Sequence, residues 1–361
     1  MLSKRRNHLT NSIEQMSSSD VERLQTLTRS LLDSATLASS MRPEVIELSE
    51  LIGARQGEGE DRDHNISLGE TLTANGLALS PRMASMCLDD VARTVIFMRG
   101  VYSAINDLMG EIDGRPVRVL YAGCGPFAPL CLPLMSVLPA GMAEFTLLDI
   151  HAESISSARA LVKRLGLDNS IASYVTEDAC DYRIDSAHPP DLIVIEVLQA
   201  CLQAEPQVAV ARHLLAQAPA ALLVPERISI RLDLVDVGKE FSVSGSANER
   251  SSQQRGRLAS GELFCLDRQS IVAWGECRDD VLPAASVQLP ESWDRRYQPM
   301  AFTEITSYRA HRLGDYDSGL TCPRSPTIDG ALEPGVLIDF SYELGHNPGL
   351  IGRCRDTARR P

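Results

Sequence analysis

The sequence lacks a surplus of basic residues. Its 361 residues include 35 Lys and Arg against 48 Asp and Glu, so the formal net charge is −13. Proteins that bind nucleic acid through its phosphates usually carry a basic face. The charge therefore argues against a nucleic-acid partner, whereas an acidic protein favours solubility and is compatible with a cationic ligand.

Patterns typical of disulfide frameworks and metal sites are also missing. The nine cysteines are odd in number and no two share a CxxC spacing, and the seven histidines form no HxxxH or HExxH pattern. Frameworks of disulfides and zinc sites usually show such regular spacing. We therefore expect reduced thiols in a cytoplasmic protein, and no metal.

No segment has the form of a secretory signal or a membrane span. Basic residues 4–6 are not followed by an apolar core. The uncharged stretch 119–143 is long enough to cross a bilayer, but it is interrupted by Pro126, Pro129, Pro133 and Pro139. A strand, a turn and a short buried helix explain this stretch better, so we expect no membrane partner.

The middle of the chain alternates short apolar runs with amphipathic segments. Apolar runs that predict buried strands cover 117–122, 145–149, 171–175, 191–195 and 221–224. Apolar residues at helical spacing predict helices over 153–165, ended by Gly166, and over 207–217. Buried strands that alternate with helices indicate an α/β fold with a doubly wound, Rossmann-like parallel sheet.

The flanking regions follow different patterns. Residues 1–80 are predicted to form a helical N-terminal extension, and another helical stretch, 81–108, opens the sheet domain at 81–225. From Ile228 to Leu234 the apolar period drops to two, which predicts a half-exposed strand. We therefore predict a β-rich, barrel-like domain over 226–361, with further strands near 270–274, 301–308 and 336–342. The polar stretch 242–262 is predicted to be a loop or flexible insertion.

Glycines and carboxylates follow three successive predicted strands. Gly123 and Gly125 form a turn after the first strand, Asp149 closes the second, and Asp178 follows the third. Glycine lets a ligand approach the backbone closely, and a carboxylate at the second position can bind both ribose hydroxyls. Since the carboxyl ends of parallel strands meet in one crevice, these residues predict a nucleotide-type cofactor site.

The turn Ala122-Gly-Cys-Gly-Pro126 resembles motif I of S-adenosylmethionine (SAM) methyltransferases. The resemblance implies SAM as cofactor and S-adenosylhomocysteine as product, and Cys124, Ile150 and Ala179 complete the implied cofactor-binding set. Tyr121 stands where such enzymes usually carry an acidic residue, and Phe127 where they often carry glycine. NAD is the alternative cofactor, since Ala128 occupies the third slot of a GxGxxG spacing, where alanine is sometimes found.

Glu196 ends the fourth predicted strand and Glu205 follows nine residues later. Their position and spacing resemble the double-Glu loop of protein arginine methyltransferases. The segment 223–230 resembles that family's passage from the Rossmann domain to its barrel. The segment 90–97 resembles its N-terminal helix, which implies that Arg93 contacts the carboxylate of SAM. The family also implies a homodimer.

Two carboxylates suit a cationic substrate, since they can bind a planar guanidinium bidentately and draw charge away from one nitrogen. Glu196 and Glu205 are therefore the predicted catalytic residues. The Thr-His-Trp loop of arginine methyltransferases is absent. Tyr297 or His311 are candidates to line the pocket, and residues 1–80 are candidates to cover it. This favours a SAM-dependent N-methyltransferase for a small guanidino or amino metabolite, with free arginine as the best guess.

Three other functions remain open at this point. One is methylation of arginine in proteins, which an open acidic groove would favour. Another is a regulatory SAM-binding protein without catalysis, which the departures at Tyr121 and Phe127 allow. The last is an NAD-dependent oxidoreductase. Measuring which cofactor, SAM or NAD, protects the protein against heat would distinguish this function from the others.

Overall fold

The computed structural model describes residues 18–53, 68–241, 255–275 and 280–355. At its centre lies a five-stranded sheet in the order β5-β4-β3-β6-β7, and every neighbouring pair is parallel. The strands are β3 (Val117–Ala122), β4 (Ala143–Asp149), β5 (Ile171–Thr176), β6 (Leu192–Ile195) and β7 (Leu222–Val224). The prediction of an α/β fold with a parallel sheet is confirmed, because these apolar runs are indeed strands.

The strand order reverses direction at β3. The chain runs from β3 outward through α5 (Leu132–Met135), β4 and α6 (Ala152–Leu165) to β5, then returns to β6 beside β3. From there α7 (Gln207–Gln217) leads to β7. Right-handed crossovers in opposite directions place α6 and α7 on opposite faces of the sheet. The crevice between β3 and β6 is therefore a topological switch point, where such sheets bind ligands.

The uncharged stretch 119–143 forms the end of β3, a turn, the buried helix α5 and the start of β4. This matches the strand, turn and short helix that the prolines indicate. Among the residues that the structure describes, no helix has the length and apolar character needed to cross a membrane.

The helical stretch predicted over 81–108 is divided in two. Helix α3 (Pro81–Met86) and the 3-10 helix η2 (Cys87–Asp89) precede α4 (Val91–Glu111). The break occurs at Asp90, whose backbone is extended and whose side chain caps α4 by accepting a hydrogen bond from the Arg93 amide. Such an N-cap fixes where a helix begins, so Arg93 lies in the first turn of α4.

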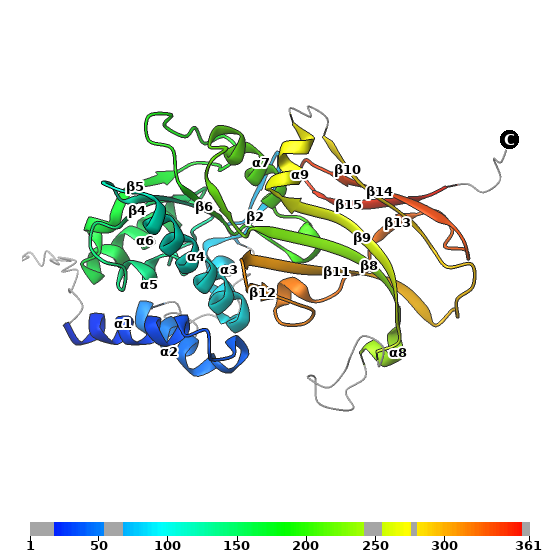
Figure 1. Ribbon diagram of the computed structural model, residues 1–361, viewed down its shortest axis with the longest axis horizontal. Helices are drawn as coiled ribbons and strands as arrows, with labels where there is room; N and C mark the ends of the chain where they lie inside the picture. Colours follow the sequence, from blue (N-terminus) through cyan, green and yellow to red (C-terminus); the bar gives the residue numbers. More distant parts are fainter. Residues whose placement is uncertain (1–17, 54–67, 242–254, 276–279, 356–361) are drawn as a thin grey trace, which may run out of the picture.

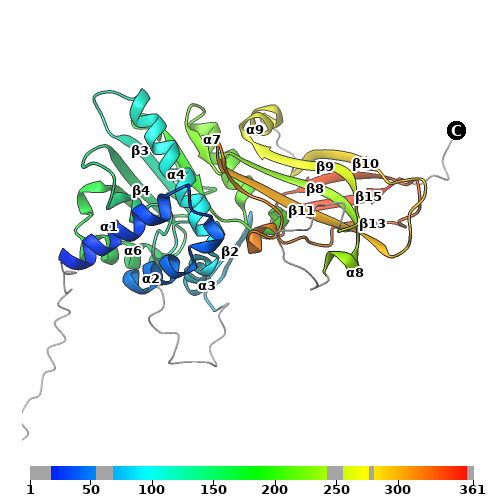
Figure 2. The same cartoon turned by 60° about the horizontal axis from the view of Figure 1, so that its bottom comes forward.

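Helices α1 (Ser18–Leu32) and α2 (Arg42–Ile52) pack against α4, below the sheet in Figure 1 and beside α4 in Figure 2. The buried side chain of Arg99 joins them, since it donates to the carbonyl oxygens of Leu31, Asp33 and Thr36 just where α1 ends. The described part of the N-terminal region is thus helical up to Ile52, and the polar segment 56–64 lies outside the described residues.

After β7 the chain forms two four-stranded sheets. The first has the order β12-β11-β8-β9, from β8 (Arg227–Asp236), β9 (Arg257–Asp267), β11 (Tyr297–Tyr308) and β12 (His311–Leu313). The second has the order β10-β14-β15-β13, from β10 (Val281–Gln288), β13 (Thr327–Asp329), β14 (Leu337–Glu343) and β15 (Gly349–Cys354). The β-rich character is confirmed. In the described residues no hydrogen-bonded strand pair joins the two sheets, so a closed barrel remains a prediction.

Two predictions about this region are wrong. The strand expected near 270–274 is helix α9 (Arg268–Trp274), because Asp267 caps it by accepting from the Ser270 amide at 2.8 Å. Its buried residues Ile271 and Trp274 are three apart, a helical spacing. Residues 257–262 of the predicted loop belong to β9, where they pair with β8, while 242–254 lie outside the described residues.

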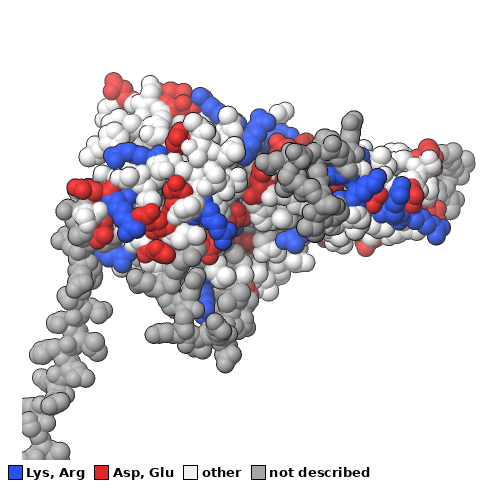
Figure 3. Space-filling model, turned by 90° about the horizontal axis from the view of Figure 1, so that it is seen from below, with Lys and Arg blue, Asp and Glu red and all other residues white. Residues whose placement is uncertain are grey.

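Charges of both signs are mixed over the surface. On the face shown in Figure 3, the described acidic and basic side chains are interspersed over the helices and the β-rich region. The net charge of −13 is thus not gathered into one field on this face. The carboxylates of the predicted site lie instead in a pocket.

Candidate active site

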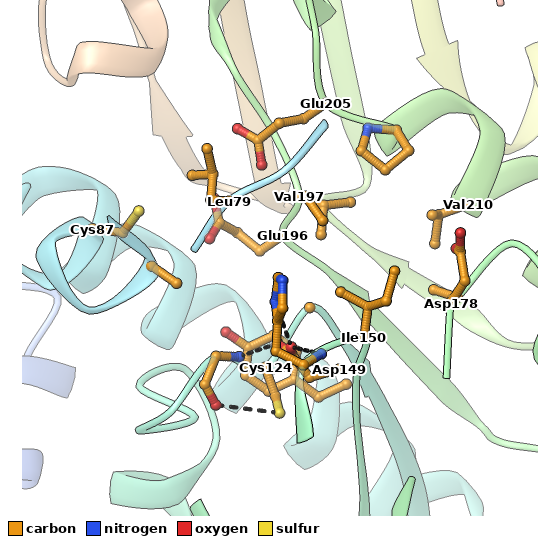
Figure 4. A pocket seen from close by; sticks show the side chains of 18 of the residues that line it. Leu79, Cys87, Cys124, Asp149, Ile150, Asp178, Glu196, Val197, Glu205 and Val210 are labelled. Carbon is orange, nitrogen blue, oxygen red and sulfur yellow. Dashed lines mark hydrogen bonds and ion pairs between the residues drawn. The ribbon is translucent and has the colours of Figure 1, made fainter. Parts of the chain in front are cut away.

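A pocket lies at the carboxyl ends of β3, β4 and β6. The ten residues that the sequence predicts as catalytic or cofactor-binding all line this pocket: Arg93, Gly123, Cys124, Gly125, Asp149, Ile150, Asp178, Ala179, Glu196 and Glu205. In Figure 4, Glu196 and Glu205 lie at one end of the pocket and Cys124 and Asp149 at the other.

The turn after β3 needs its glycines. Gly123 and Gly125 have φ of +75° and +62°, which side chains rarely allow. A Cβ on Gly123 would lie 2.4 Å from Cγ1 of Val197, so this turn packs directly on the loop after β6. The turn therefore brings the ends of β3 and β6 into contact, and its backbone lines the pocket without side chains.

Asp149 and Asp178 are oriented by backbone amides. Asp149 accepts from the amides of Gly125 and His151, each at 2.9 Å, and Asp178 accepts from the Cys180 amide at 2.8 Å. A carboxylate has about four acceptor positions, so both side chains retain capacity for a ligand. Asp149 is thus held by amides from its own edge of the sheet.

Arg93 and Glu196 form an ion pair inside the pocket. The sequence assigned them to different partners, yet they contact each other across 103 residues of chain. Burial raises the pKa of Glu196, and the Arg93 charge opposes that rise. Burial likewise lowers the pKa of Arg93, but the adjacent Glu196 carboxylate outweighs it, so Arg93 remains charged. The geometry is that of a largely enclosed charged pair in which Arg93 orients Glu196.

Glu205 differs from Glu196, because no described basic side chain forms an ion pair with it. Its side chain is buried, and its partner is the side chain of Gln199. Burial, reinforced by the negative charge of Glu196, raises the pKa of Glu205 to about 8. At neutral pH Glu205 is therefore mostly protonated beside the ion pair of Glu196 and Arg93, and a cation that enters the pocket would favour ionisation of Glu205.

A β-hairpin that the sequence analysis did not predict covers part of the pocket. A hairpin of β1 (Thr71–Thr73) and β2 (Gly76–Ala78) lies on the loop of Glu205. The Leu77 amide donates to the Ala204 oxygen at 2.8 Å, and a Cβ on Gly76 would be 2.6 Å from that same oxygen. Thr73 and Ala78 line the pocket. This hairpin is the described part of residues 1–80 to which the expectation of a cover over the pocket applies. Its turn could have been predicted from the sequence, because Asn75-Gly76 is a typical turn dipeptide.

Cys87 also lines the pocket, beside Arg93. A thiolate there would be a nucleophile, but burial raises the pKa of Cys87 to about 11. The thiol is therefore neutral at physiological pH and acts as a small wall residue. Tyr121, which replaces the usual acidic residue of motif I, is another buried wall residue.

Neither Tyr297 nor His311 lies among the described residues that line the pocket, so this prediction is wrong. Tyr297 begins β11, and the His311 ring is within 3.0 Å of the Ser103 hydroxyl on α4. Every described lining residue lies between Thr73 and Val210. The β-rich region thus contributes no described side chain to the wall.

Comparison with known proteins gives little further guidance. No protein-family model matches the sequence, and no curated protein matches it. Among solved structures, the chain is similar to that of Arabidopsis thaliana protein arginine methyltransferase 10, described as uniquely open in conformation. The TM-score is 0.44 at 14% identity, over 71% of this chain and 86% of that one. A similarity at this level carries no conclusion about activity, which must come from the pocket itself.

Proposed function

We propose that this protein is a SAM-dependent N-methyltransferase that acts on a small cationic guanidino or amino compound, with free L-arginine as the best candidate. The observation that carries the proposal is the pairing, in one pocket, of a glycine turn and Asp149 with two glutamates, of which Glu205 is buried and Glu196 is paired with Arg93. The first part suits a nucleoside cofactor, and the second suits a cation.

The residues present fit SAM. The backbone at Gly123 and Gly125 would lie along the cofactor, the free acceptor positions of Asp149 would take the ribose hydroxyls, and Asp178 would face the adenine amino group. Arg93 has donors beyond the one that binds Glu196, and these would meet the cofactor carboxylate. When bound, SAM would supply a methyl group on a cationic sulfur.

The glutamates would act on the substrate nitrogen. Glu196, oriented by Arg93, and Glu205, ionised by the arriving cation, would bind two N–H groups and leave a third nitrogen toward the methyl group. Methyl transfer forms one N–C bond and breaks one S–C bond, and the methylated nitrogen then loses a proton. The ionised carboxylate of Glu205 can accept that proton.

A small substrate is favoured over a protein. Glu205 is buried, the Glu196 side chain is only 9% exposed, and the hairpin β1–β2 covers the loop that carries Glu205. An arginine in a protein would need an open path for its flanking backbone. The enclosed carboxylates and the covering hairpin favour a small molecule that fits entirely inside the pocket.

The test is mass spectrometry after incubation of the full chain and SAM with free arginine, other guanidino and amine metabolites, and an Arg-Gly-rich peptide. The proposal predicts a gain of one methyl group on a small cation. Methylation of the peptide alone would replace it with the protein-modifying function. Binding of SAM without any methylation across the panel would support a non-catalytic SAM-binding protein.

A further inference from the structure

The loop between β6 and α7, which carries both glutamates, contains a strained segment. Cys201, Leu202 and Ala204 have φ of 60°, 55° and 62°, in the left-handed region that residues other than glycine rarely adopt. Such conformations persist only where the surrounding structure enforces them. Glu205 follows directly, so whatever enforces the strain also sets the position of its carboxylate.

Two hydroxyl groups from the β-rich region bind this segment. The Cys201 amide donates to Oγ1 of Thr303 at 2.8 Å, and the hydroxyl of Tyr342 donates to the Leu202 oxygen at 2.7 Å. Thr303 lies in β11 and Tyr342 in β14, one in each of the two four-stranded sheets. Both side chains are fully buried, so neither hydrogen bond competes with solvent.

The third strained residue is bound on both sides. The Ala204 amide donates to the oxygen of Pro348 at 3.0 Å, and its own oxygen accepts from the Leu77 amide at 2.8 Å. Each left-handed residue thus has a hydrogen bond to a segment distant in sequence. These partners come from three strands and one strand-end loop, none of which forms part of the parallel sheet.

The tyrosine is itself firmly placed. Its ring stacks on Phe264 with centroids 4.8 Å apart, and Phe264 stacks on Trp274 at 5.2 Å. A ring held in such a stack presents its hydroxyl in one direction. The position of the Leu202 oxygen therefore depends on the core of the β-rich region.

We propose that Thr303 and Tyr342 are positioning residues that hold loop 199–205 in its strained form and thereby keep the Glu205 carboxylate in the pocket. This inference rests on the proposed function. It gives the β-rich region a part in the reaction although none of its described side chains lines the pocket. Its contribution is the shape of the loop.

The test uses Tyr342→Phe and Thr303→Val in the full chain, each of which removes one hydroxyl and little volume. Tyr308→Phe is the matched control, because the Tyr308 hydroxyl binds Asp107 on α4 at 2.8 Å, away from this loop. For each variant kcat, KM, SAM affinity, the pH profile of kcat/KM and hydrogen exchange of residues 199–206 would be measured.

We expect kcat to fall about tenfold in both test variants, with SAM affinity within about twofold of wild type. Loop amides would exchange faster, and the rise of kcat/KM near pH 8 would move to lower pH as Glu205 becomes more exposed to solvent. The control would leave turnover, the pH profile and loop exchange unchanged.

Unchanged loop exchange and turnover in both test variants would overturn the proposal. Faster exchange with normal turnover, or an equal loss of turnover in Tyr308→Phe, would also overturn it. Hydrogen exchange separates this inference from the proposed function. If the wild type methylates nothing, the proposed function fails, while faster loop exchange in the test variants alone would still show that Thr303 and Tyr342 hold the loop.

Discussion

The two ends of the pocket are built in different ways. At the cofactor end, Asp149 binds the amides of Gly125 and His151, which lie 24 and 2 residues away in the chain. At the glutamate end, the loop before Glu205 binds Thr303 and Tyr342, over 100 residues away. The first end is assembled within one sheet edge, and the second depends on contacts between distant regions. Changes at each end should therefore have separable effects.

The largest expected effect is at the glutamate end. Glu196→Gln keeps an oxygen that can accept from Arg93 but removes the charge that we propose binds the substrate cation. We expect turnover to fall by about a thousandfold or more, while SAM affinity stays nearly intact. Turnover assays and calorimetric titration of SAM would measure the two effects. Normal turnover would remove Glu196 from the mechanism.

At the cofactor end, Asp149→Ala removes the acceptor proposed for the ribose hydroxyls. It also frees the amides of Gly125 and His151. We expect SAM affinity to fall about 10- to 100-fold, because two charge-assisted hydrogen bonds are lost. Titration of SAM into the variant measures this, and Asp178→Asn serves as a milder comparison. Unchanged affinity would contradict the ribose assignment.

Glu205 should give a pH-dependent effect. Its folded-state pKa of about 8 lies above the ordinary value of 4.5, so the folded protein binds this proton more tightly than the unfolded chain. The free energy of unfolding should therefore decrease as pH rises from 4.5 to 8, and Glu205→Gln should remove that decrease. We would compare the free energy of unfolding of the variant with that of wild type at each pH. The difference, variant minus wild type, should be roughly 2–4 kcal/mol larger at pH 8 than at pH 5.

Denaturant unfolding at the two pH values measures this difference. The same group should make kcat/KM of the wild type rise through pH 8, since the ionised carboxylate binds the cation. In Glu205→Gln the residual activity should lack that rise. An equal stability difference at pH 5 and pH 8 would show that Glu205 is not held protonated in the pocket.

The smallest expected effect is at the wall between the two ends. Cys87→Ser should change turnover by no more than about threefold, because a thiol whose pKa is raised to about 11 is neutral and takes no covalent part. Thiol alkylation followed by mass spectrometry should also show little labelling of Cys87 at pH 8. Rapid labelling, or loss of turnover on substitution, would give this thiol a chemical role.

The contrast between the two ends also explains what the sequence could predict. The strands, helix α6 and the glycine turn follow from local periodicity and turn residues, and all ten predicted site residues line one pocket. Parallel strands bring their carboxyl ends together whatever the details of packing. Asp149 and Glu196 could thus be placed from the sequence alone.

Other features depend on contacts that the sequence does not display. The ion pair of Arg93 and Glu196 spans 103 residues, and the strained loop depends on hydroxyls in β11 and β14. Strand β9 begins within a polar stretch because pairing with β8 overrides its weak local pattern. The sequence predicts a strand at helix α9 because seven residues are too few to display a clear helical period of apolar residues.

The most direct test of the central claim is transfer of an isotopically labelled methyl group from SAM to free arginine and related small cations, with wild type and Glu196→Gln compared side by side. The account predicts a labelled, singly methylated small molecule with the wild type and none with the variant, while both bind SAM. Equal label transfer by the two proteins, or SAM binding without transfer to any small cation, would contradict it.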